Sequence, residues 1–599
     1  MKFKLEIINK KGIKSFGTNK EDLDYLSFLR DHGYSIPADC GGRGICGKCL
    51  IRFIYPENPE LTPVEKELLP EKLINSGYRL ACQQQIHKSS RIALEFEESI
   101  KSAGESFDIE FTCNPKYSKY LIQAEQIVED GKTGIIDNLL ELTGLKKVEL
   151  SALKKFGKLI NKSSQLTLTV QNKTVNDITE GNTVHRLFGL AVDAGTTTVA
   201  VYLVDLNTGN TLDYLSQSNL QRTYGADIIS RIQFTRETKK GNDIIQKKLL
   251  ETINQAQKIL CQKNNISEQD IYNCTVCGNP FILHSLLAVS VDSLGEIPYS
   301  PIFNSGQIIR TEETSLNINN SGTLSLIPGL AGNVGSDLTA GLLVIEKLQQ
   351  KGKPYILLDI GTNGEIVLNT GNEVLCCAAA AGPALEGGNI SCGTAGIPGA
   401  ISEVQTGENR PNLKTISSRE PIGICGSGVI DLTAYLLEKK IIDSTGKISK
   451  AIDEKQIIEH ESGKAFLISQ DNNIYLSQKD IREIQLAKGA IATGIEILLE
   501  EADLNYEAIN NIFLAGGFGS SLKTESICRL GILPDKVKNK IMKLGNSAGT
   551  GTRLYLLDDN ARKRAEKLRK KAVYFSLGNR MDFQKKFVQN MNFPEHSSL

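Results

Sequence analysis

The sequence lacks an excess of charge of either sign. Lysine and arginine together number 69, aspartate and glutamate also number 69, and the formal net charge is +0. A protein that binds nucleic acid along its surface needs a broad basic face, and this balance supports none. The basic stretch at 561–571 is most simply the solvated face of a late helix. The composition therefore speaks against nucleic acid as a partner.

Long apolar runs are also missing. No run reaches the roughly 18 residues that a membrane-spanning helix requires. Residues 1–7 alternate polar and apolar side chains like a strand, without the apolar core of a signal peptide. We therefore expect a cytoplasmic protein with no membrane partner. No Rossmann glycine fingerprint follows a strand, so the chain should not reduce a flavin or nicotinamide by itself and needs an external electron donor.

Cysteine is present, but not as a secreted disulfide framework, because 13 cysteines are spread over 599 residues. Cys40, Cys46 and Cys49 share one glycine-rich loop, and Cys82 returns from a later segment. Four thiolates in this arrangement make a soft-ligand cage suited to an iron-sulfur cluster. The alternatives are a zinc knuckle or disulfides. A four-thiolate zinc site usually comes from two Cys-x2-Cys pairs, and the loop contains one.

The spacing of the loop cysteines resembles one branch of the 2Fe-2S ferredoxins. Five residues separate Cys40 from Cys46, as in adrenodoxin and putidaredoxin, where the plant-type pattern has four. This branch implies a ubiquitin-like fold for residues 1–97. Within it, Thr62 and Glu65 predict the capping box of a helix. The expected strands are 3–8, 48–54 and 91–97.

The next part of the chain carries little recognisable chemistry. Residues 98–116 are polar and weakly periodic, as in a linker. We expect a small α/β middle domain over 117–185, with a helix at 135–142 and a strand at 166–170. It is too short for an enzyme core. Its predicted role is that of a spacer or a docking domain for a partner.

From residue 186 to the end, one device occurs twice. A buried strand leads into Asp193-Ala-Gly-Thr-Thr and a second strand, and a similar strand leads into Asp359-Ile-Gly-Thr-Asn and its own second strand. Such duplication predicts two related halves, approximately 186–350 and 351–599. Each turn can present backbone N–H groups and hydroxyls to phosphate. Each aspartate lies at a strand end, where it can hold a hydrated Mg²⁺.

Two further glycine runs fit a nucleotide site. Gly516, Gly517 and Gly519 follow a strand and leave bare backbone on which adenine and ribose can lie. Gly426 and Ser427 precede an amphipathic segment and offer a helix N-terminus to an anion. Both runs resemble the adenosine and connecting motifs of the acetate and sugar kinase, heat-shock ATPase and actin superfamily. The alternative is that they are only tight turns in an α/β sheet.

The whole chain resembles the reductive activators of corrinoid-dependent methyltransferases and corrinoid iron-sulfur proteins, which join a 2Fe-2S domain, a small middle domain and an ATPase of this superfamily. The resemblance implies a multidomain α+β and α/β protein whose residues 186–599 form a duplicated ribonuclease-H-like (actin-like) ATPase domain. It extends to segments 224–232, 278–284, 333–337, 382–387, 485–488, 545–551 and 587–594.

The function that this resemblance implies is ATP-dependent return of inactive cob(II) in a corrinoid protein to cob(I), by one-electron transfer from the 2Fe-2S cluster. The cob(II)/cob(I) couple lies below the range usual for such a donor. Plant-type clusters lie near about −400 mV, and each further 59 mV or so uphill costs about 1.4 kcal/mol for one electron. ATP must therefore enter the cycle, and we expect it to switch the complex between docked and released states.

The resemblance also implies residue roles. The cluster ligands are Cys40, Cys46, Cys49 and Cys82. The Mg²⁺ and water ligands are Asp193 and Asp359, and Glu386 orients water unless it is an ordinary loop acid. The phosphate ligands are Gly195, Thr196, Thr197, Gly361, Thr362 and Asn363. The residues near the nucleoside and the connecting helix are Gly426, Ser427, Gly516, Gly517 and Gly519.

Four other residues have open assignments. Ser391 and Cys392 either face the corrinoid partner or form a buried turn. Cys274 and Cys277 form a Cys-x2-Cys pair without a matching second pair, and we interpret them as buried inert thiols. A homodimer is a further possibility that the sequence leaves open.

Other classes of protein share part of this pattern. A plain electron carrier needs no phosphate hairpins, and a small-molecule kinase has no use for a cluster. An ATP-dependent donor for a non-corrinoid enzyme would share both features. A redox-sensing chaperone-like binder would bind ATP and a polypeptide. Activators of radical or dehydratase enzymes share the cluster between subunits, whereas this chain has its own cysteine loop.

Overall fold

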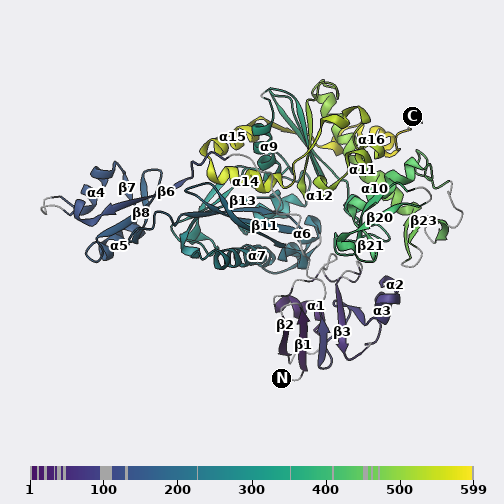
Figure 1. The fold of residues 1–599 in the computed structure, drawn as a ribbon, viewed down its shortest axis with the longest axis horizontal. Coiled ribbons are helices and arrows are strands. Elements are labelled where there is room, and N and C mark those ends of the chain that lie inside the picture. The colour runs from purple at the N-terminus through teal and green to yellow at the C-terminus, as the bar shows by residue number, and fades with distance from the viewer. Residues whose placement is uncertain are drawn as a thin grey trace.

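A computed structural model of the chain describes residues 3–595 except 10–11, 19–22, 33, 35, 37–41, 43, 45–46, 48, 58, 70, 95–110, 129–132, 226, 351, 395, 408–409, 450–455, 461–462 and 470–472. Cys40 and Cys46 lie outside the described residues. Figure 1 shows the amino-terminal domain in purple at the bottom, a small blue domain at the left and two larger lobes, with helices α9 and α14 between them.

The amino-terminal domain is a mixed sheet with short helices. Its strand order is β2-β1-β5-β3-β4, with β1 and β5 parallel and the other pairs antiparallel. Buried side chains that include Leu5, Phe28 and Ile51 form its core. The predicted capping box is confirmed, since Thr62 and Glu65 exchange bonds at the start of α2. The elements are β1 (Phe3–Asn9), β2 (Gly12–Thr18), α1 (Tyr25–Asp31), β3 (Leu50–Tyr55), α2 (Pro63–Leu68), α3 (Glu71–Asn75), β4 (Tyr78–Leu80) and β5 (Ser90–Ala93).

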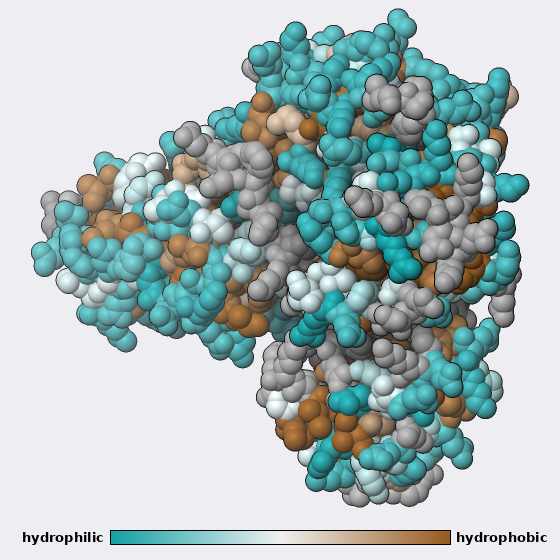
Figure 2. All heavy atoms as spheres, turned by 45° about the vertical axis from the view of Figure 1, so that its right-hand side comes forward, coloured by the Kyte–Doolittle hydropathy of each residue, from teal (hydrophilic) through white to brown (hydrophobic). Residues whose placement is uncertain are grey.

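A small four-stranded sheet follows, with strand order β6-β8-β9-β7. Helices α4 and α5 contribute Leu139 and Phe156 to its core. Other leucines of these helices face outward: Leu142 is 60% exposed and Leu150 is 63% exposed. Figure 2 shows hydrophobic residues among the hydrophilic ones on this domain, at the left. The elements are β6 (Tyr117–Gln123), η1 (Ala124–Gln126), α4 (Ile135–Thr143), β7 (Lys147–Val148), α5 (Leu150–Leu159), β8 (Gln165–Gln171) and β9 (Thr174–Glu180).

The first half of the duplicated region is built on a six-stranded sheet, β12-β11-β10-β13-β15-β14. Strands β10, β11 and β12 are antiparallel neighbours, and β13 and β15 run parallel to β10. The elements are β10 (Phe188–Ala194), β11 (Thr198–Asp205), β12 (Thr211–Ser218), η2 (Leu220–Tyr224), α6 (Ile228–Glu237), α7 (Gly241–Lys263), η3 (Glu268–Asp270), β13 (Ile271–Cys277), α8 (Pro280–Leu286), η4 (Asp292–Leu294), β14 (Gln307–Arg310), η5 (Thr311–Glu313) and β15 (Thr323–Leu326).

The second half repeats this plan in the sheet β26-β25-β16-β17-β18-β27. Again three antiparallel strands, β16, β17 and β18, are followed on the other side by parallel β25 and β26. The shared strand order confirms the predicted duplication. The strands are β16 (Tyr355–Ile360), β17 (Gly364–Asn369), β18 (Val374–Ala379), β25 (Asn511–Ala515), β26 (Ile541–Lys543) and β27 (Ala572–Tyr574).

Two three-stranded sheets and several helices surround this second sheet. They are η6 (Pro383–Glu386), β19 (Ala400–Gln405), β20 (Asn412–Thr415), η7 (Ile416–Ser418), β21 (Gly423–Ile424), α10 (Gly426–Glu438), β22 (Ile457–His460), β23 (Gly463–Ser469), β24 (Ile474–Ser477), α11 (Gln478–Glu501), α12 (Gly516–Ser521), α13 (Thr524–Leu530), η9 (Asp535–Lys540), η10 (Leu577–Asn579) and α16 (Phe583–Met591). Among the described helices, none is long and apolar enough to cross a membrane.

Three further helices join the halves: α9 (Ser336–Leu348), α14 (Ser547–Leu557) and α15 (Asp559–Lys571). Helix α9 packs in one cluster with the second sheet, although it follows the first half in the chain. Helix α14 packs on β10 and β13 of the first sheet, although it follows the second sheet. The two helices cross at close range, because a Cβ added to Gly551 would lie 1.9 Å from the Ala340 carbonyl oxygen. Only glycine fits this crossing.

Candidate functional site

Cys49 and Cys82 are the two predicted cluster ligands that the structure describes, and it brings them together. Their Sγ atoms lie 3.3 Å apart, and both cysteines are free thiols. The hydrogen bond from Cys49, with smaller contributions from Gln83 and the Gly44 backbone, lowers the pKa of Cys82 to about 6. Because metals bind the thiolate form, this environment suits a metal ligand.

The surrounding backbone also fits an iron-sulfur cluster. Gly42, Gly44 and Gly47 have φ values of 105°, 74° and 67°, which side-chain-bearing residues rarely adopt. The buried Glu65 accepts hydrogen bonds from the Leu80 backbone N–H at 2.7 Å and from the Gln84 amide at 2.8 Å. Helix α2 is thereby fastened to the segment that carries Cys82. The residues present fit a 2Fe-2S cluster held by Cys49, Cys82 and further thiolates of the loop.

The first phosphate hairpin, between β10 and β11, is tightly braced. Gly195 N–H donates to the Thr198 carbonyl at 2.9 Å, and the Asn219 amide donates to the Gly195 carbonyl at 2.9 Å. The guanidinium of Arg231, fully buried on α6, donates to the Thr196 carbonyl at 2.6 Å. Thr197 lies exposed at the tip of the turn. This turn holds its shape through bonds to distant parts of the first half.

Asp193, at the end of β10, is surrounded by hydrogen-bond donors. The Asn546 amide donates to its Oδ2 at 2.9 Å, and the Cys277 thiol lies 3.7 Å from its Oδ1. Burial raises the pKa of Asp193, and these two contacts oppose the shift. Cys274 and Cys277 are both buried, as predicted, and burial raises the pKa of each thiol, which fits the interpretation of both as inert. Cys277 in addition contacts Asp193, which the sequence did not indicate.

The second hairpin, between β16 and β17, is braced more lightly. Gly361 N–H donates to the Asn363 carbonyl at 3.0 Å. The exposed Thr362 hydroxyl donates to Glu386 Oε2 at 2.7 Å. The bond from Thr362, a residue of the turn itself, places Glu386 beside the predicted phosphate turn. Its position fits the predicted role of orienting water.

Both aspartates face the crossing helices. Side chains alternate along a strand, so Asp359 shares a sheet face with Leu357, which packs in the α9 cluster. Asp193 likewise shares a face with Ala191, which packs with Leu556 of α14. The ends of the two sheets and the N-termini of α9 and α14 therefore converge on the same region. Helix N-termini favour negative charge, which suits a phosphate site.

Two further carboxylates belong to this region, and neither was assigned a role from the motifs of the sequence. Asp337 lies in the first turn of α9, and Glu365 is the cross-strand partner of Asp359. Burial, followed by the charges of Asp337, Asp193 and Glu386, raises the pKa of Asp359 to about 7. Burial raises the pKa of Asp337 to about 6. The concentration of negative charge calls for a cation when nucleotide binds.

This donor set fits a hydrated Mg²⁺. Within the described ranges, no three histidine, cysteine or acidic side chains are close enough to hold an ion between them. Mg²⁺ is usually bound by one or two carboxylates, with waters and substrate phosphates as the other ligands. Asp193 and Asp359 can supply carboxylates from opposite sides, and the remaining ligands would come from water and ATP.

The glycine run after β25 meets the second hairpin directly. Gly516 has a φ of 80°, and a Cβ there would lie 2.7 Å from Asp359 Oδ1. Gly519 has room for a Cβ, with its nearest neighbours at 3.8 Å. Gly517 lies between them at the start of α12. The predicted nucleoside run and the predicted Mg²⁺ ligand are therefore neighbours.

Packing accounts for much of the other glycine run. A Cβ on Gly426 would lie 2.4 Å from the Leu385 carbonyl and 2.6 Å from the Phe518 ring. The Ser427 hydroxyl donates to the Ser402 carbonyl at 2.7 Å. Gly426 does begin a helix, α10, as predicted. Its small size is explained by neighbours within the protein.

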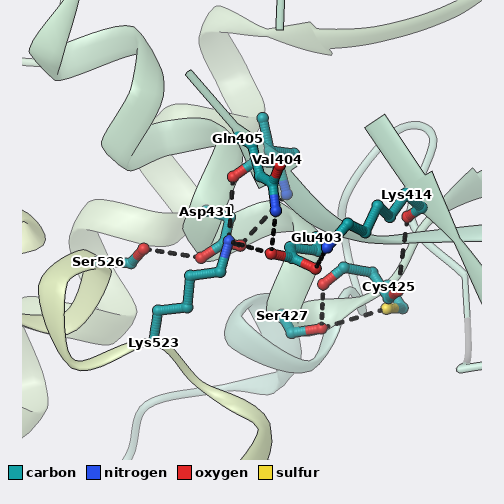
Figure 3. A network of polar contacts seen from close by, with 10 residues as sticks. Glu403, Val404, Gln405, Lys414, Cys425, Ser427, Asp431, Lys523 and Ser526 are labelled. Carbon is teal, nitrogen blue, oxygen red and sulfur yellow. Dashed lines mark hydrogen bonds and ion pairs between the residues drawn. The ribbon is translucent and has the colours of Figure 1, made fainter. Parts of the chain in front are cut away.

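A polar network anchors this helix to its surroundings (Figure 3). Lys523, just before α13, lies 2.8 Å from Asp431 of α10 and 3.0 Å from Glu403 of β19. The buried Asp431 also accepts from the Ser526 hydroxyl at 2.7 Å. Lys414, then Gln405 and Lys523, lower the pKa of Glu403 to about 2. The network joins β19, β20, α10 and α13 around the run that contains Gly426 and Ser427.

Ser391 and Cys392 form a loop beside α11. The exposed Ser391 donates from its hydroxyl to Asp480 Oδ1 at 2.9 Å and from its backbone N–H at 2.8 Å. Cys392 is half-buried and accepts a weak bond from the Tyr475 N–H at 3.5 Å. The contacts fix the loop, and its predicted role toward a partner stays a prediction.

Three family models match consecutive parts of the chain. Residues 9–86 match the 2Fe-2S iron-sulfur cluster binding domain, residues 188–351 match the RACo middle region, and residues 353–599 match the C-terminal domain of RACo, described as the ASKHA domain. The second of these matches falls on the first half of the duplicated region.

One curated relative matches almost the whole chain, and another matches more than half of it. The corrinoid activation enzyme RamQ of Eubacterium limosum is 29% identical over 578 residues, which cover 93% of this chain and 94% of that protein. The [Co(II) methylated amine-specific corrinoid protein] reductase of Methanosarcina barkeri is 26% identical over 404 residues, covering 60% of this chain and 68% of that protein.

A solved structure agrees in both sequence and fold. The reductive activator for corrinoid, iron-sulfur protein is 30% identical, covers 98% of each chain and superposes with a TM-score of 0.71. With the three family matches and the duplicated fold, this similarity shows that the chain belongs to the RACo family of reductive activators of corrinoid proteins.

Proposed function

We propose that this protein is an ATP-dependent reductive activator that returns cob(II) of a corrinoid protein to cob(I) by one-electron transfer from its own 2Fe-2S cluster. The observation that carries the proposal is the presence on one chain of the Cys49–Cys82 thiol pair, 3.3 Å apart, and of two hairpins that direct Asp193 and Asp359 toward one region. An electron carrier needs only the first of these, and a kinase needs only the second.

Each part has a defined chemical task. When bound, a 2Fe-2S cluster supplies one electron at low potential and Mg-ATP supplies the free energy of hydrolysis. Cys49 and Cys82, together with Cys40 and Cys46, would hold the cluster. Asp193 and Asp359 would hold hydrated Mg²⁺ from opposite sides. The Thr196, Thr197, Thr362 and Asn363 segments would hold phosphate oxygens through N–H and O–H groups.

Glu386 would orient the attacking water. A carboxylate has about four acceptor positions, so Glu386 can accept a hydrogen bond from water as well as the one that the Thr362 hydroxyl donates to its Oε2. Because Thr362 belongs to the phosphate turn, binding of phosphate at this turn would shift the Thr362 hydroxyl and, through their hydrogen bond, the Glu386 carboxylate. This pairing couples occupancy of the site to the position of the carboxylate.

The direct test uses the visible spectrum of a cob(II) corrinoid protein mixed anaerobically with this protein and a low-potential reductant, with or without Mg-ATP. Growth of the cob(I) band only with Mg-ATP is the expected result. Cys82→Ala and Asp193→Asn should each abolish it. Cys113→Ala is the matched control, because Cys113 is an exposed thiol that contacts the Leu206 carbonyl and no predicted ligand.

The same experiment separates the alternatives. If cob(II) persists with several corrinoid proteins while ATP is hydrolysed, the acceptor is a different low-potential enzyme. If ATP phosphorylates an added small molecule, the protein is a kinase with an accessory ferredoxin domain. An external electron donor, a possible homodimer and a cytoplasmic location stay predictions.

A further inference from the structure

Asn546 occupies a junction between the two halves of the nucleotide site. It is 6% exposed and caps α14, where its Oδ1 accepts from the Gly549 N–H at 2.7 Å. Its Nδ2 faces the other way and donates to Asp193 Oδ2 at 2.9 Å and to the Tyr202 hydroxyl oxygen at 3.2 Å. One amide thus links a helix N-terminus to the aspartate of the first hairpin.

Asn546 lies on the segment that connects the second sheet to a helix packed on the first sheet. Strand β26 ends at Lys543 in the second sheet, and α14 begins at Ser547 and packs on β10 and β13 of the first sheet. Asn546 therefore lies where the chain passes from one half to the other. The hydrogen bond to Asp193 forms only while α14 keeps its place on β10.

The contact also distinguishes the two oxygens of Asp193. Oδ2 accepts a hydrogen bond from the amide, whereas Oδ1 lies 3.7 Å from the Cys277 thiol, which is a weak donor. A carboxylate held by one oxygen has a fixed plane and can present the other oxygen to an ion. Groups that orient metal ligands in this way commonly change metal affinity or activity by about 10–100-fold when they are removed.

We propose that Asn546 is a positioning residue of the nucleotide site: it orients Asp193 for hydrated Mg²⁺ and makes that orientation depend on the seating of α14 against β10. The inference rests on the proposed ATP-dependent function. It concerns an amide that acts through the aspartate to which it donates. The Oδ1 of Asn546 caps α14 and its Nδ2 donates to Asp193, so substitutions can remove the second role and keep the first.

The separating substitutions are Asn546→Asp and Asn546→Ser. Aspartate keeps both the size and the capping oxygen but replaces the donor with a carboxylate oxygen facing Asp193. Serine also caps helices well but is too short to reach Asp193. Asp227→Ser is the matched control, since Asp227 caps α6 by accepting from the Ser230 N–H at 2.7 Å and does not contact Asp193.

Two readouts are measured for each variant. The first is kcat and KM for ATP as a function of Mg²⁺ concentration. The second is the rise in unfolding temperature that Mg-ADP produces, which reports binding without turnover. We expect kcat to fall about 10–100-fold in Asn546→Asp and about tenfold in Asn546→Ser, with more Mg²⁺ needed for the thermal shift. The unfolding temperature without ligand should stay near that of wild type.

The outcomes are distinct. If both Asn546 variants match wild type and Asp227→Ser in kcat and Mg²⁺ dependence, Asn546 is only a helix cap and the inference fails. If neither variant folds, its role is structural and the inference also fails. A wild-type protein that neither binds nor hydrolyses Mg-ATP overturns the proposed function together with this inference, whereas an ATPase that does not reduce a corrinoid overturns only the corrinoid assignment.

Discussion

The two phosphate hairpins have nearly the same sequence but different supports. In the first, the buried Arg231 donates to the Thr196 carbonyl and Asn219 donates to the Gly195 carbonyl. In the second, the exposed Thr362 donates to Glu386. A local motif therefore sets the path of the turn, and distant residues set how firmly it is held. We interpret the first hairpin as the fixed side of the site and the second as the side that responds to ligand.

The aspartates repeat this contrast. Asp193 is approached by donors, from Asn546 and Cys277, whereas the charges near Asp359 are those of Asp337, Asp193 and Glu386. Donors fix a carboxylate in one orientation, and nearby negative charges disfavour its ionised form until a cation arrives. The predictions below test this difference, in order of decreasing effect on the free energy of unfolding.

Arg231→Met removes the main brace of the first hairpin. The guanidinium also donates to the buried Gly225 carbonyl at 2.9 Å, so this carbonyl and the partly buried Thr196 carbonyl both lose a charged donor. We expect a loss of about 3 kcal/mol in the free energy of unfolding, measured with denaturant, and a higher KM for ATP. Arg236→Met on the same helix is the control. Arg236 forms ion pairs with Asp292 and Glu296 at the surface, so its substitution should lower the free energy of unfolding by less than about 1 kcal/mol. Equal losses would contradict the special role of Arg231.

Exchanging the central glycine of each turn for alanine compares the two hairpins directly. A Cβ on Gly195 would lie 2.8 Å from the Thr198 carbonyl oxygen, whereas on Gly361 its nearest neighbours are at 3.7 Å. Gly195→Ala should destabilise the protein by about 2 kcal/mol, because backbone must move. Gly361→Ala should change the free energy of unfolding by less than about 0.5 kcal/mol. If the KM for ATP rises in this variant, the added methyl group obstructs the phosphate, and loss of stability does not account for the rise. Similar stabilities for the two variants would show that both turns are equally tight.

The second half carries an additional support at its outer side, which depends on pH. Lys488 of α11 is buried and donates to the Asn592 carbonyl at 2.7 Å, which fastens the C-terminal segment. Burial lowers the pKa of Lys488 from 10.5 to about 8. Above about pH 8 the unfolded chain binds more protons at this residue than the folded protein, so stability from this group rises with pH. We expect a gain of about 1 kcal/mol between about pH 8 and pH 9 that is absent in Lys488→Met. Parallel pH curves for the two proteins would refute it.

Thr362→Val should have the smallest effect on stability. It removes an exposed hydroxyl, and we expect the free energy of unfolding to change by below about 0.5 kcal/mol. The rate of ATP hydrolysis should fall several-fold, because Glu386 loses the donor that places it. Thr362→Ser keeps the hydroxyl and should retain activity. A fully active valine variant would remove Glu386 from the proposed site.

The parts of this protein that could be predicted from sequence are those in which neighbouring residues decide the structure. The capping box at Thr62 and both hairpins occupy short stretches whose turn residues fix the local backbone. The cysteine pattern likewise indicates its own chemistry, and the structure brings Cys49 and Cys82 together. Duplication could be recognised because the same local device occurs twice.

The supports of the site could not be predicted in this way, since they depend on how strands pair. Cys277 is buried, as expected, but the parallel pairing of β10 with β13 sets it opposite Asp193. Asn546 reaches Asp193 across 353 positions of sequence. From the sequence, Arg231 would be predicted to lie exposed on a surface helix, yet it is fully buried. Such contacts arise from tertiary packing, for which one sequence carries no local signal.

The crossing of α9 and α14 at Gly551 limits how the two lobes can move. The Ala340 carbonyl rests against a residue that has no side chain, between Thr550 and Thr552. Sliding α14 along α9 would bring side chains from the same face of α14, three residues away at Ala548 and Leu554, against that carbonyl. Turning one helix against the other keeps the contact. The close approach at Gly551 therefore resists sliding of the two helices and permits a change in the angle at which they cross. Any movement of one half of the duplicated region against the other at this point is then a change of angle, with the distance between α9 and α14 held constant.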